Sequence, residues 1–327
     1  MALGAVAAGA AAVAYAALYE VRAFVVREVT VPVLPSGSDP LRILHISDVH
    51  LVPTQEAKRA WLRTLADTEP DLVVNTGDNL AHKQALPAVL ESYGDLLDLP
   101  GVFVFGSNDY YSPILKNPAR YLLGGTGTAA DRTAWWTKRP RDLPFEEMRR
   151  AFTERGWLDL TNRHDTLTVD GRRLAFVGVD DPHLGFDVLD EEPADASADL
   201  AIGVAHAPYL RVLDRWNALG YPLILAGHTH GGQLCIPGFG ALVTNCDIDR
   251  GRASGLHQHA TAGHDPSWMH VSAGAGTSPF TPVRFACRPE ATLLTLTGID
   301  SAGLSARRAA TLPRGVAQLG SAHRSGR

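Results

Sequence analysis

The strongest constraint on the fold is an alternation of apolar strands and helices in the first third of the chain. Short apolar, largely β-branched runs at residues 41–47, 72–76 and 102–105 predict strands, and residues 55–67 and 86–97 predict helices. This order favours parallel strands with helices packed against the sheet. Because ligand sites of such folds lie at the strand ends, we expect the functional residues there.

The rest of the chain predicts further elements of a second sheet. Asp170-Gly171 is typical of a two-residue turn and predicts a hairpin between residues 166–169 and 173–177. Further short strands are expected at residues 201–204, 223–225, 269–272 and 292–296. Residues 111–160 lack this rhythm and are interpreted as an insertion, and residues 301–327 as a disordered tail.

Composition limits the classes of function. The chain has 327 residues, 45% of them hydrophobic, which suffices for a sizeable core. A formal net charge of -5 argues against nucleic-acid binding, because it supplies no positive field for phosphates. The three cysteines lack CxxC spacing, so neither a disulfide framework nor a zinc ribbon is indicated. No obligate protein partner is evident.

The N-terminus is apolar. Residues 2–19 contain no charged side chain, so we interpret residues 1–27 as a membrane anchor and the proline-containing residues 28–40 as a linker. A cleaved signal peptide and a soluble helix are the alternatives. Arg22 and Arg27 follow the apolar run and none precedes it, which predicts a cell-membrane protein with its catalytic domain in the cytoplasm.

Polar motifs follow the first three predicted strands. Asp48 and His50 lie two residues apart, so an extended backbone points both side chains to one side. Asp78 follows Gly77, which permits a tight turn. Asn108 and Asp109 follow the third strand. Each motif alone has an ordinary explanation as a loop or helix cap, but three successive strand ends with such residues favour a metal site.

Histidines follow two later predicted strands. His206 follows residues 201–204, and His228 and His230 alternate after residues 223–225, which places both imidazoles on one face. Neutral imidazoles suit manganese, zinc or iron better than magnesium or calcium. The Asp180-Asp181-Pro182-His183 segment also follows a strand and can approach the site, but a turn of Asp and Pro is the favoured interpretation.

The ordered motifs Asp-x-His, Gly-Asp, Gly-Ser-Asn-Asp, His and Gly-His-Thr-His, within residues 41–233, resemble the calcineurin-like metallophosphoesterase family. The apolar start suggests a membrane-anchored bacterial type. The resemblance implies a four-layer α/β/β/α sandwich of two mixed sheets, spanning residues 41–300, after an N-terminal apolar helix. It also implies one metal ion held by Asp48, His50, Asp78 and His230, and another held by Asp78, His206, His228 and an amide from the third motif.

The third motif departs from the family pattern. Ser107 occupies the position of the family's asparagine ligand, and Asn108 that of the histidine that assists the leaving group. Asn108 is therefore the candidate amide ligand, and Asp78, Asn108 and Asp109 are the candidate catalytic residues. For Asp109 a structural hydrogen bond to the neighbouring loop is the favoured interpretation.

The predicted chemistry is hydrolysis of a phosphoester or pyrophosphate by water that two divalent or trivalent metal ions activate, with manganese, zinc or iron as candidates. The substrate is expected to be a phosphorylated small molecule or lipid. The membrane anchor favours a lipid-linked pyrophosphate. A metal-binding scaffold without turnover and a metal-dependent amide or ester hydrolase are the alternatives.

Overall fold

The computed structural model describes residues 2–115 and 136–299. The predicted disordered tail at residues 301–327 lies outside the described residues, as does the middle of the predicted insertion. Two six-stranded sheets form the centre of the fold.

The first sheet combines the three predicted N-terminal strands with strands from both ends of the chain. Its strands, in spatial order, are β1 (Val25–Leu34), β14 (Glu290–Gly298), β2 (Leu41–Ile46), β3 (Leu72–Asn75), β4 (Gly101–Phe103) and β5 (Leu158–Asp159). Only the pairing of β14 with β2 is antiparallel, so the sheet is mixed. Strands β2, β3 and β4 are nearly all apolar because both of their faces are covered.

The second sheet is mixed as well. Its strands, in spatial order, are β12 (Gly255–His259), β13 (Ser267–Val271), β9 (Leu223–Ala226), β8 (Leu200–Val204), β7 (Arg172–Gly178) and β6 (Arg163–Val169). The two outer pairs are antiparallel and the three inner pairs are parallel. The predicted hairpin around Asp170-Gly171 joins β6 to β7.

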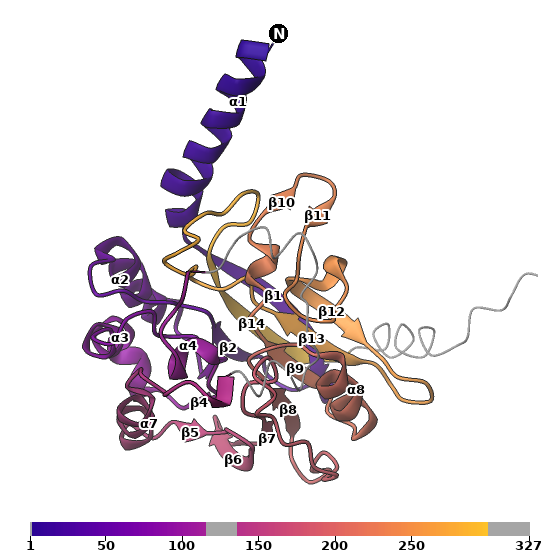
Figure 1. Cartoon of the computed structure of the whole chain (residues 1–327). Helices are drawn as coiled ribbons and strands as arrows, with labels where there is room; N and C mark the ends of the chain where they lie inside the picture. The colour runs from indigo at the N-terminus through magenta and orange to yellow at the C-terminus, as the bar shows by residue number, and fades with distance from the viewer. Residues whose placement is uncertain (1, 116–135, 300–327) are drawn as a thin grey trace, which may run out of the picture.

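Helices cover the outer faces of both sheets (Figure 1). The helices of the first layer are α2 (Glu56–Arg63), α3 (Leu86–Tyr93) and α7 (Phe145–Glu154), and their side chains pack with those of the first sheet. Helix α8 (Leu210–Ala218) packs on the second sheet. A third apolar cluster lies between the sheets. The predicted α/β fold with two mixed sheets is therefore confirmed.

Short elements complete the described chain. They are helix α4 (Ser107–Tyr110), strands β10 (Cys235–Ile236) and β11 (Gly240–Ala241), and the 3-10 helices η3 (Thr64–Thr68), η4 (Gly94–Asp98), η5 (His230–Gly232) and η6 (Arg250–Arg252). Residues 111–160 were predicted as an insertion. They contribute strand β5 to the first sheet and helix α7 to the helical layer that packs on it. The histidine-rich segment around His257 forms strand β12.

The predicted membrane-spanning helix is wrong. Helix α1 covers the 13 residues Ala2–Ala14. It is followed by a short π-helix, η1 (Tyr15–Tyr19), and by a 3-10 helix, η2 (Glu20–Arg22). Within the described residues, none of the helices combines the length and apolarity needed to cross a bilayer. The cell-membrane localisation and the orientation inferred from that helix are corrected accordingly.

The chain enters the first sheet earlier than predicted. Residues 28–40 were expected to form a linker, but strand β1 occupies Val25–Leu34 and pairs in parallel with β14. Val31 and Leu34 are fully buried in the cluster between the sheets. Pro32 and Pro35 gave this segment the composition of a linker, yet Pro32 lies in an edge strand, where a missing N–H is tolerated. Upstream, the buried Glu20 accepts hydrogen bonds from the backbone N–H groups of residues 286 and 287.

Candidate metal centre

The loops after β2, β3, β4, β8 and β9 carry the predicted site residues. Their backbone is unusual, because Asp48, His50, Asp78, His228 and His230 all have positive φ angles, between 44° and 69°. Residues other than glycine adopt this conformation at a cost, and it clusters at functional sites. The strain therefore coincides with the residues that the motifs singled out.

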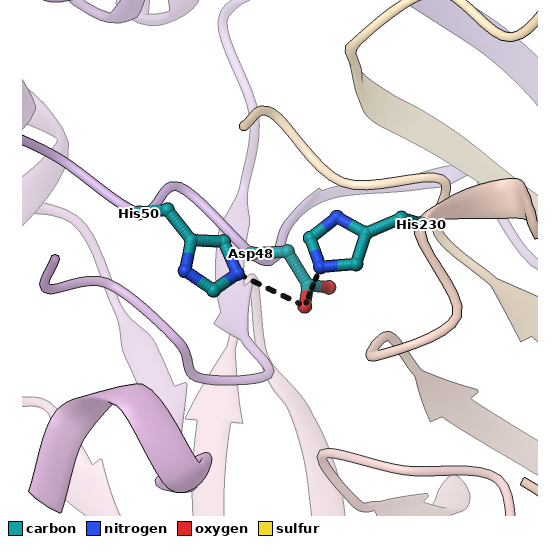
Figure 2. A group of neighbouring side chains, drawn as sticks. All are labelled: Asp48, His50 and His230. Carbon is teal, nitrogen blue, oxygen red and sulfur yellow. Dashed lines mark ion pairs between the residues drawn. The ribbon is translucent and has the colours of Figure 1, made fainter. Parts of the chain in front are cut away.

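One group of potential ligands consists of Asp48, His50 and His230. Figure 2 shows the Asp48 carboxylate between the two rings, with both Nε2 atoms directed toward the same oxygen. The distances from Asp48 Oδ1 are 3.9 Å to His50 Nε2 and 3.6 Å to His230 Nε2. Such separations leave room for a cation between the donor atoms.

A second group consists of Asp48, Asp78 and His206. Asp78 Oδ2 lies 3.6 Å from His206 Nε2 and 3.4 Å from His50 Nε2. Asp78 therefore stands between a histidine of the first group and the histidine of the second. This is the arrangement that a bridging carboxylate requires.

His228 adjoins the second group without belonging to either. Its Nδ1 lies 3.2 Å from His206 Nε2, and its Nε2 lies 3.4 Å from the carbonyl oxygen of Asn245. Nδ1 is thus the ring atom that faces the centre. The structure brings together all six residues that the sequence predicted as carboxylate and imidazole ligands.

Supporting hydrogen bonds orient the potential ligands. Asp48 Oδ2 accepts from Ser47 Oγ at 2.6 Å and from the backbone N–H of His228 at 2.8 Å, which leaves Oδ1 to face the centre. His206 Nδ1 lies 2.7 Å from the carbonyl oxygen of Thr76, and His230 Nδ1 lies 3.0 Å from that of Gly276. These contacts fix both rings with Nε2 inward, the usual second layer of a metal site.

The chemistry of the residues fits a bound cation. Asp48 Oδ1 and both ring nitrogens of His50 are buried without a hydrogen-bond partner in the described structure, a cost that a metal ion would remove. Burial lowers the pKa of His50 well below its ordinary value, so the ring is neutral and able to ligate. Burial alone would lower the pKa of His206, but Asp78, Asp181 and Asp48 raise it to about 9. The centre therefore attracts positive charge.

Asn108 contacts Asp78 with its nitrogens. Its backbone N–H donates to Asp78 Oδ1 at 2.6 Å, and its side-chain Nδ2 donates to Asp78 Oδ2 at 2.9 Å. In this orientation the amide holds the carboxylate rather than offering its own oxygen. The predicted role of Asn108 as a metal ligand requires the amide to turn about its terminal torsion, and stays a prediction.

Asp109 lies behind Asp78 and is fully buried. Its Oδ2 accepts from the backbone N–H groups of Asp78 and Gly106, and its Oδ1 accepts from that of Asn79. Burial, and the negative charge of Asp78, raise the pKa of Asp109 to about 7. With both oxygens engaged by backbone, Asp109 joins the second and third loops and has no oxygen directed at a substrate.

Two further residues adjoin the centre, in a segment for which a turn was the favoured interpretation. Asp181 is fully buried, and its charge acts on both His206 and Asp78. The His183 ring centroid lies 4.5 Å from that of His228, and its Nδ1 lies 3.1 Å from the Tyr209 hydroxyl. The only available signal was their place after a predicted strand, which a turn of Asp and Pro explains equally well.

Comparison with known proteins agrees with this geometry. Residues 41–232 match the family described as calcineurin-like phosphoesterase. The chain belongs to this family. The chain is therefore a phosphoric ester hydrolase that depends on metal ions. The two ligand groups described above suit divalent ions.

Curated relatives span most of the chain. The uncharacterized metallophosphoesterase YkuE of Bacillus subtilis is 28% identical over 277 residues, which cover 80% of this calcineurin-like phosphoesterase and 81% of YkuE. YkoQ of the same organism is 26% identical over 257 residues, covering 77% and 82%. The phosphodiesterase YaeI of Escherichia coli is 25% identical over 266 residues, covering 79% and 82%.

Proposed function

We propose that the chain hydrolyses phosphodiester or pyrophosphate bonds with a centre of two metal ions. The observation that carries this proposal is the position of Asp78 between two histidines. Its Oδ2 lies 3.4 Å from His50 Nε2 and 3.6 Å from His206 Nε2. One ion is assigned to Asp48, His50, Asp78 and His230, and the other to Asp78, His206 and His228. Manganese, zinc or iron fits a set rich in imidazole.

When bound, such ions lower the pKa of water and offset the negative charge of a phosphate group. The protein's own residues hold the ligands in place. Ser47 fixes the Asp48 carboxylate, Thr76 and Gly276 fix two imidazoles, and Asn108 fixes Asp78 through two hydrogen bonds. Asp109 holds the loop of Asp78 against the loop of Asn108.

The residue at position 108 narrows the range of substrates. An alkoxide leaving group needs a proton from a general acid, and the asparagine at this position cannot supply one. Leaving groups of low pKa, such as aryl oxides and phosphates, depart without that proton. Aryl diesters and phosphoanhydrides are therefore better substrates than alkyl phosphomonoesters in this proposal. The relative YaeI is a phosphodiesterase by name, which supports phosphodiesters as substrates.

A lipid-linked pyrophosphate is a more specific candidate substrate. The sequence suggested it through an N-terminal membrane anchor, but within the described residues no helix is long and apolar enough to cross a membrane. The phosphoanhydride bond is the part of the idea that Asn108 still supports. Assays with lipid-linked and water-soluble pyrophosphates of the same headgroup distinguish whether a lipid contributes.

The test uses the full chain with added Mn²⁺ and the chromogenic diester bis(p-nitrophenyl) phosphate. We expect turnover by the wild type and a loss of at least about 100-fold in Asp78→Asn, because the central carboxylate is neutralised. Bound metal is measured in both proteins. Asp95→Asn, the same change at an exposed position, is the matched control and should keep wild-type activity.

Two other results would contradict the proposal. Bound metal without hydrolysis of the diester, of pyrophosphates or of monoesters would favour a non-catalytic scaffold. Cleavage of amides or carboxylic esters in preference to phosphoesters would favour the other class of metal-dependent hydrolase.

A further inference from the structure

Two of the three cysteines meet beside the metal centre. Cys235 lies shortly after His230 in the chain, and Cys287 lies just before strand β14. Both thiols donate to the carbonyl oxygen of Gly231, from Cys235 Sγ at 3.1 Å and from Cys287 Sγ at 3.6 Å. The two thiols are also within hydrogen-bonding reach of each other. Their separation in the sequence gave no sign of this pair, because a parallel bridge in the folded chain brings the two segments together.

The pair is part of the support of His230. Cys287 Sγ donates to the carbonyl oxygen of His230 at 3.2 Å. A Cβ at Gly231 would lie 2.6 Å from the same sulfur, so Cys287 packs directly against the turn that begins at His230. A change in the position of either sulfur is therefore transmitted to the backbone of a candidate metal ligand.

The buried Arg284 makes a second connection between Cys287 and His230. Its Nη1 lies 3.7 Å from Cys287 Sγ and donates to the carbonyl oxygen of Cys287 at 3.2 Å. Its Nη2 donates at 2.7 Å to the carbonyl oxygen of Gly276. That oxygen lies 3.0 Å from His230 Nδ1 and fixes the ring. Both the backbone and the ring of His230 thus depend on the surroundings of Cys287.

The two cysteines differ in how firmly they are held. The backbone N–H of Cys287 donates to the buried Glu20 carboxylate, and its carbonyl oxygen accepts from Arg284. Cys235 instead lies in the two-residue strand β10, between two exposed apolar side chains. A bond between the sulfurs should therefore displace the segment of Cys235, which continues directly from His230. Both cysteines are partly exposed, so a small oxidant can reach them.

We propose that Cys235 and Cys287 form a reversible disulfide that weakens metal binding at His230. The oxidant is a small disulfide such as oxidised glutathione. One protein thiol attacks a sulfur of this molecule, its S–S bond breaks, and one glutathione leaves as a thiol. The other protein thiol then attacks the mixed disulfide and releases the second glutathione, so two electrons and two protons pass from the protein to the two glutathiones.

The new bond takes both S–H donors away from the carbonyl oxygens of His230 and Gly231. Contacts of this kind orient metal ligands, and their loss typically lowers metal affinity about 10- to 100-fold. The disulfide itself is independent of the proposed function. Its effect on metal binding rests on that proposal, which assigns His230 as a ligand.

The first measurement asks whether the disulfide forms in the full, metal-free chain. Incubation with oxidised glutathione should reduce the free thiols of the wild type from three to one, and a phosphine reductant should restore them. Peptide mapping should locate the bond between Cys235 and Cys287. Cys246→Ser is the matched control, because that cysteine packs on the apolar cluster of the second sheet, and it should form the same bond. Cys235→Ser and Cys287→Ser should form none.

The second measurement compares the affinity for Mn²⁺ of oxidised and reduced protein, by the heat of binding. We expect oxidation to lower the affinity about tenfold in the wild type and in Cys246→Ser. The double variant Cys235→Ser with Cys287→Ser should bind Mn²⁺ equally before and after treatment. The comparison within the wild type needs no substitution, so it decides the question even where a variant folds poorly.

Two results would overturn this inference and leave the proposed function intact. One is the absence of a bond between Cys235 and Cys287 in treated wild type that binds Mn²⁺. The other is a disulfide that leaves the affinity for Mn²⁺ unchanged. If the reduced wild type binds no Mn²⁺, the metal centre is refuted, and the proposed function fails together with the switch.

Discussion

Asp181 has the least compensated carboxylate near the metal centre. Its Oδ1 accepts from the backbone N–H of His183, but its Oδ2 is buried without a hydrogen-bond partner among the described residues. Burial raises the pKa of Asp181 to about 8, and the nearby Asp78 charge acts in the same direction. A bound cation would offset this cost and would draw the carboxyl group into its charged form.

This gives a prediction for metal affinity. Asp181→Asn keeps the shape of the side chain and removes its negative charge, so the affinity of the full chain for Mn²⁺ should fall about 10- to 100-fold. The change is measured by titrating metal into metal-free protein and following the heat of binding. Asp95→Asn is again the control, because that residue is exposed. Equal affinities in Asp181→Asn and wild type would show that Asp181 has no part in the centre.

Single residues were predictable where motif and strand end coincided. Asp48 and Asp78 each follow an apolar run, and His228 and His230 alternate after another, so ordered motifs carried the prediction. For Asp181 and His183 a turn was favoured over a place at the site, because Asp-Asp-Pro also suits a plain turn. Whether a loop folds toward or away from a site depends on tertiary contacts, such as the bond between Tyr110 and Asp180.

Among the elements, the connections after β3 and β4 are packed most tightly. Gly77 has a φ of +89°, and a Cβ at that position would lie 2.4 Å from the backbone nitrogen of Gly106. That contact is with backbone, which cannot rotate away. The loop that carries Asp78 therefore touches the loop that carries Asn108 with no space for a side chain.

Gly77→Ala should consequently damage both stability and the centre. Two costs add, the positive φ and the overlap with Gly106, and together they should lower the free energy of unfolding by about 3 kcal/mol or more. Urea unfolding of the metal-free chain measures this change. Gly37→Ala has a similar φ of +81° but open space around it, and should lose only about 1 kcal/mol. Similar losses in both variants would refute the close contact.

Buried strands with clear apolar runs were predictable, and the edge strands β1 and β12 were not. Strands β2, β3 and β4 are buried on both faces and therefore appear in the sequence as short apolar runs. Strands β1 and β12 lie at sheet edges, where prolines and histidines are tolerated. Their pairing partners lie elsewhere in the chain, and β1 pairs with β14 more than 260 residues later, which local composition cannot indicate.

At the scale of the whole molecule, the two sheets are joined by a polar contact as well as by their apolar cluster. His45 continues the inward face of β2 after Leu41 and Ile43, and its Nδ1 lies 2.9 Å from Nδ1 of His270 on β13. His45 Nε2 lies 3.0 Å from the Thr76 hydroxyl. Two facing imidazoles can share one hydrogen bond only while at least one of them lacks its second proton.

This contact should make the joining of the sheets sensitive to acid. Burial lowers the pKa of His45 well below its ordinary value, and burial together with His257 lowers that of His270 to about 3. Below about pH 6.5 the unfolded chain takes up protons that the folded chain does not, so stability present above that pH is lost as pH falls toward 3. For His270 this proton uptake costs about 2 kcal/mol of stability between pH 6.5 and 5.0.

The prediction is tested by urea unfolding of the metal-free full chain at pH 6.5 and 5.0. Between these values the wild type should lose about 2 kcal/mol more than His270→Gln, which keeps a hydrogen-bonding group beside His45 but cannot titrate. Histidines of the metal centre are present in both proteins, so their contribution cancels in the comparison. His264→Gln, at an exposed position, should follow the wild type. Parallel losses in wild type and His270→Gln would mean that the contact between the sheets is not the acid-sensitive element.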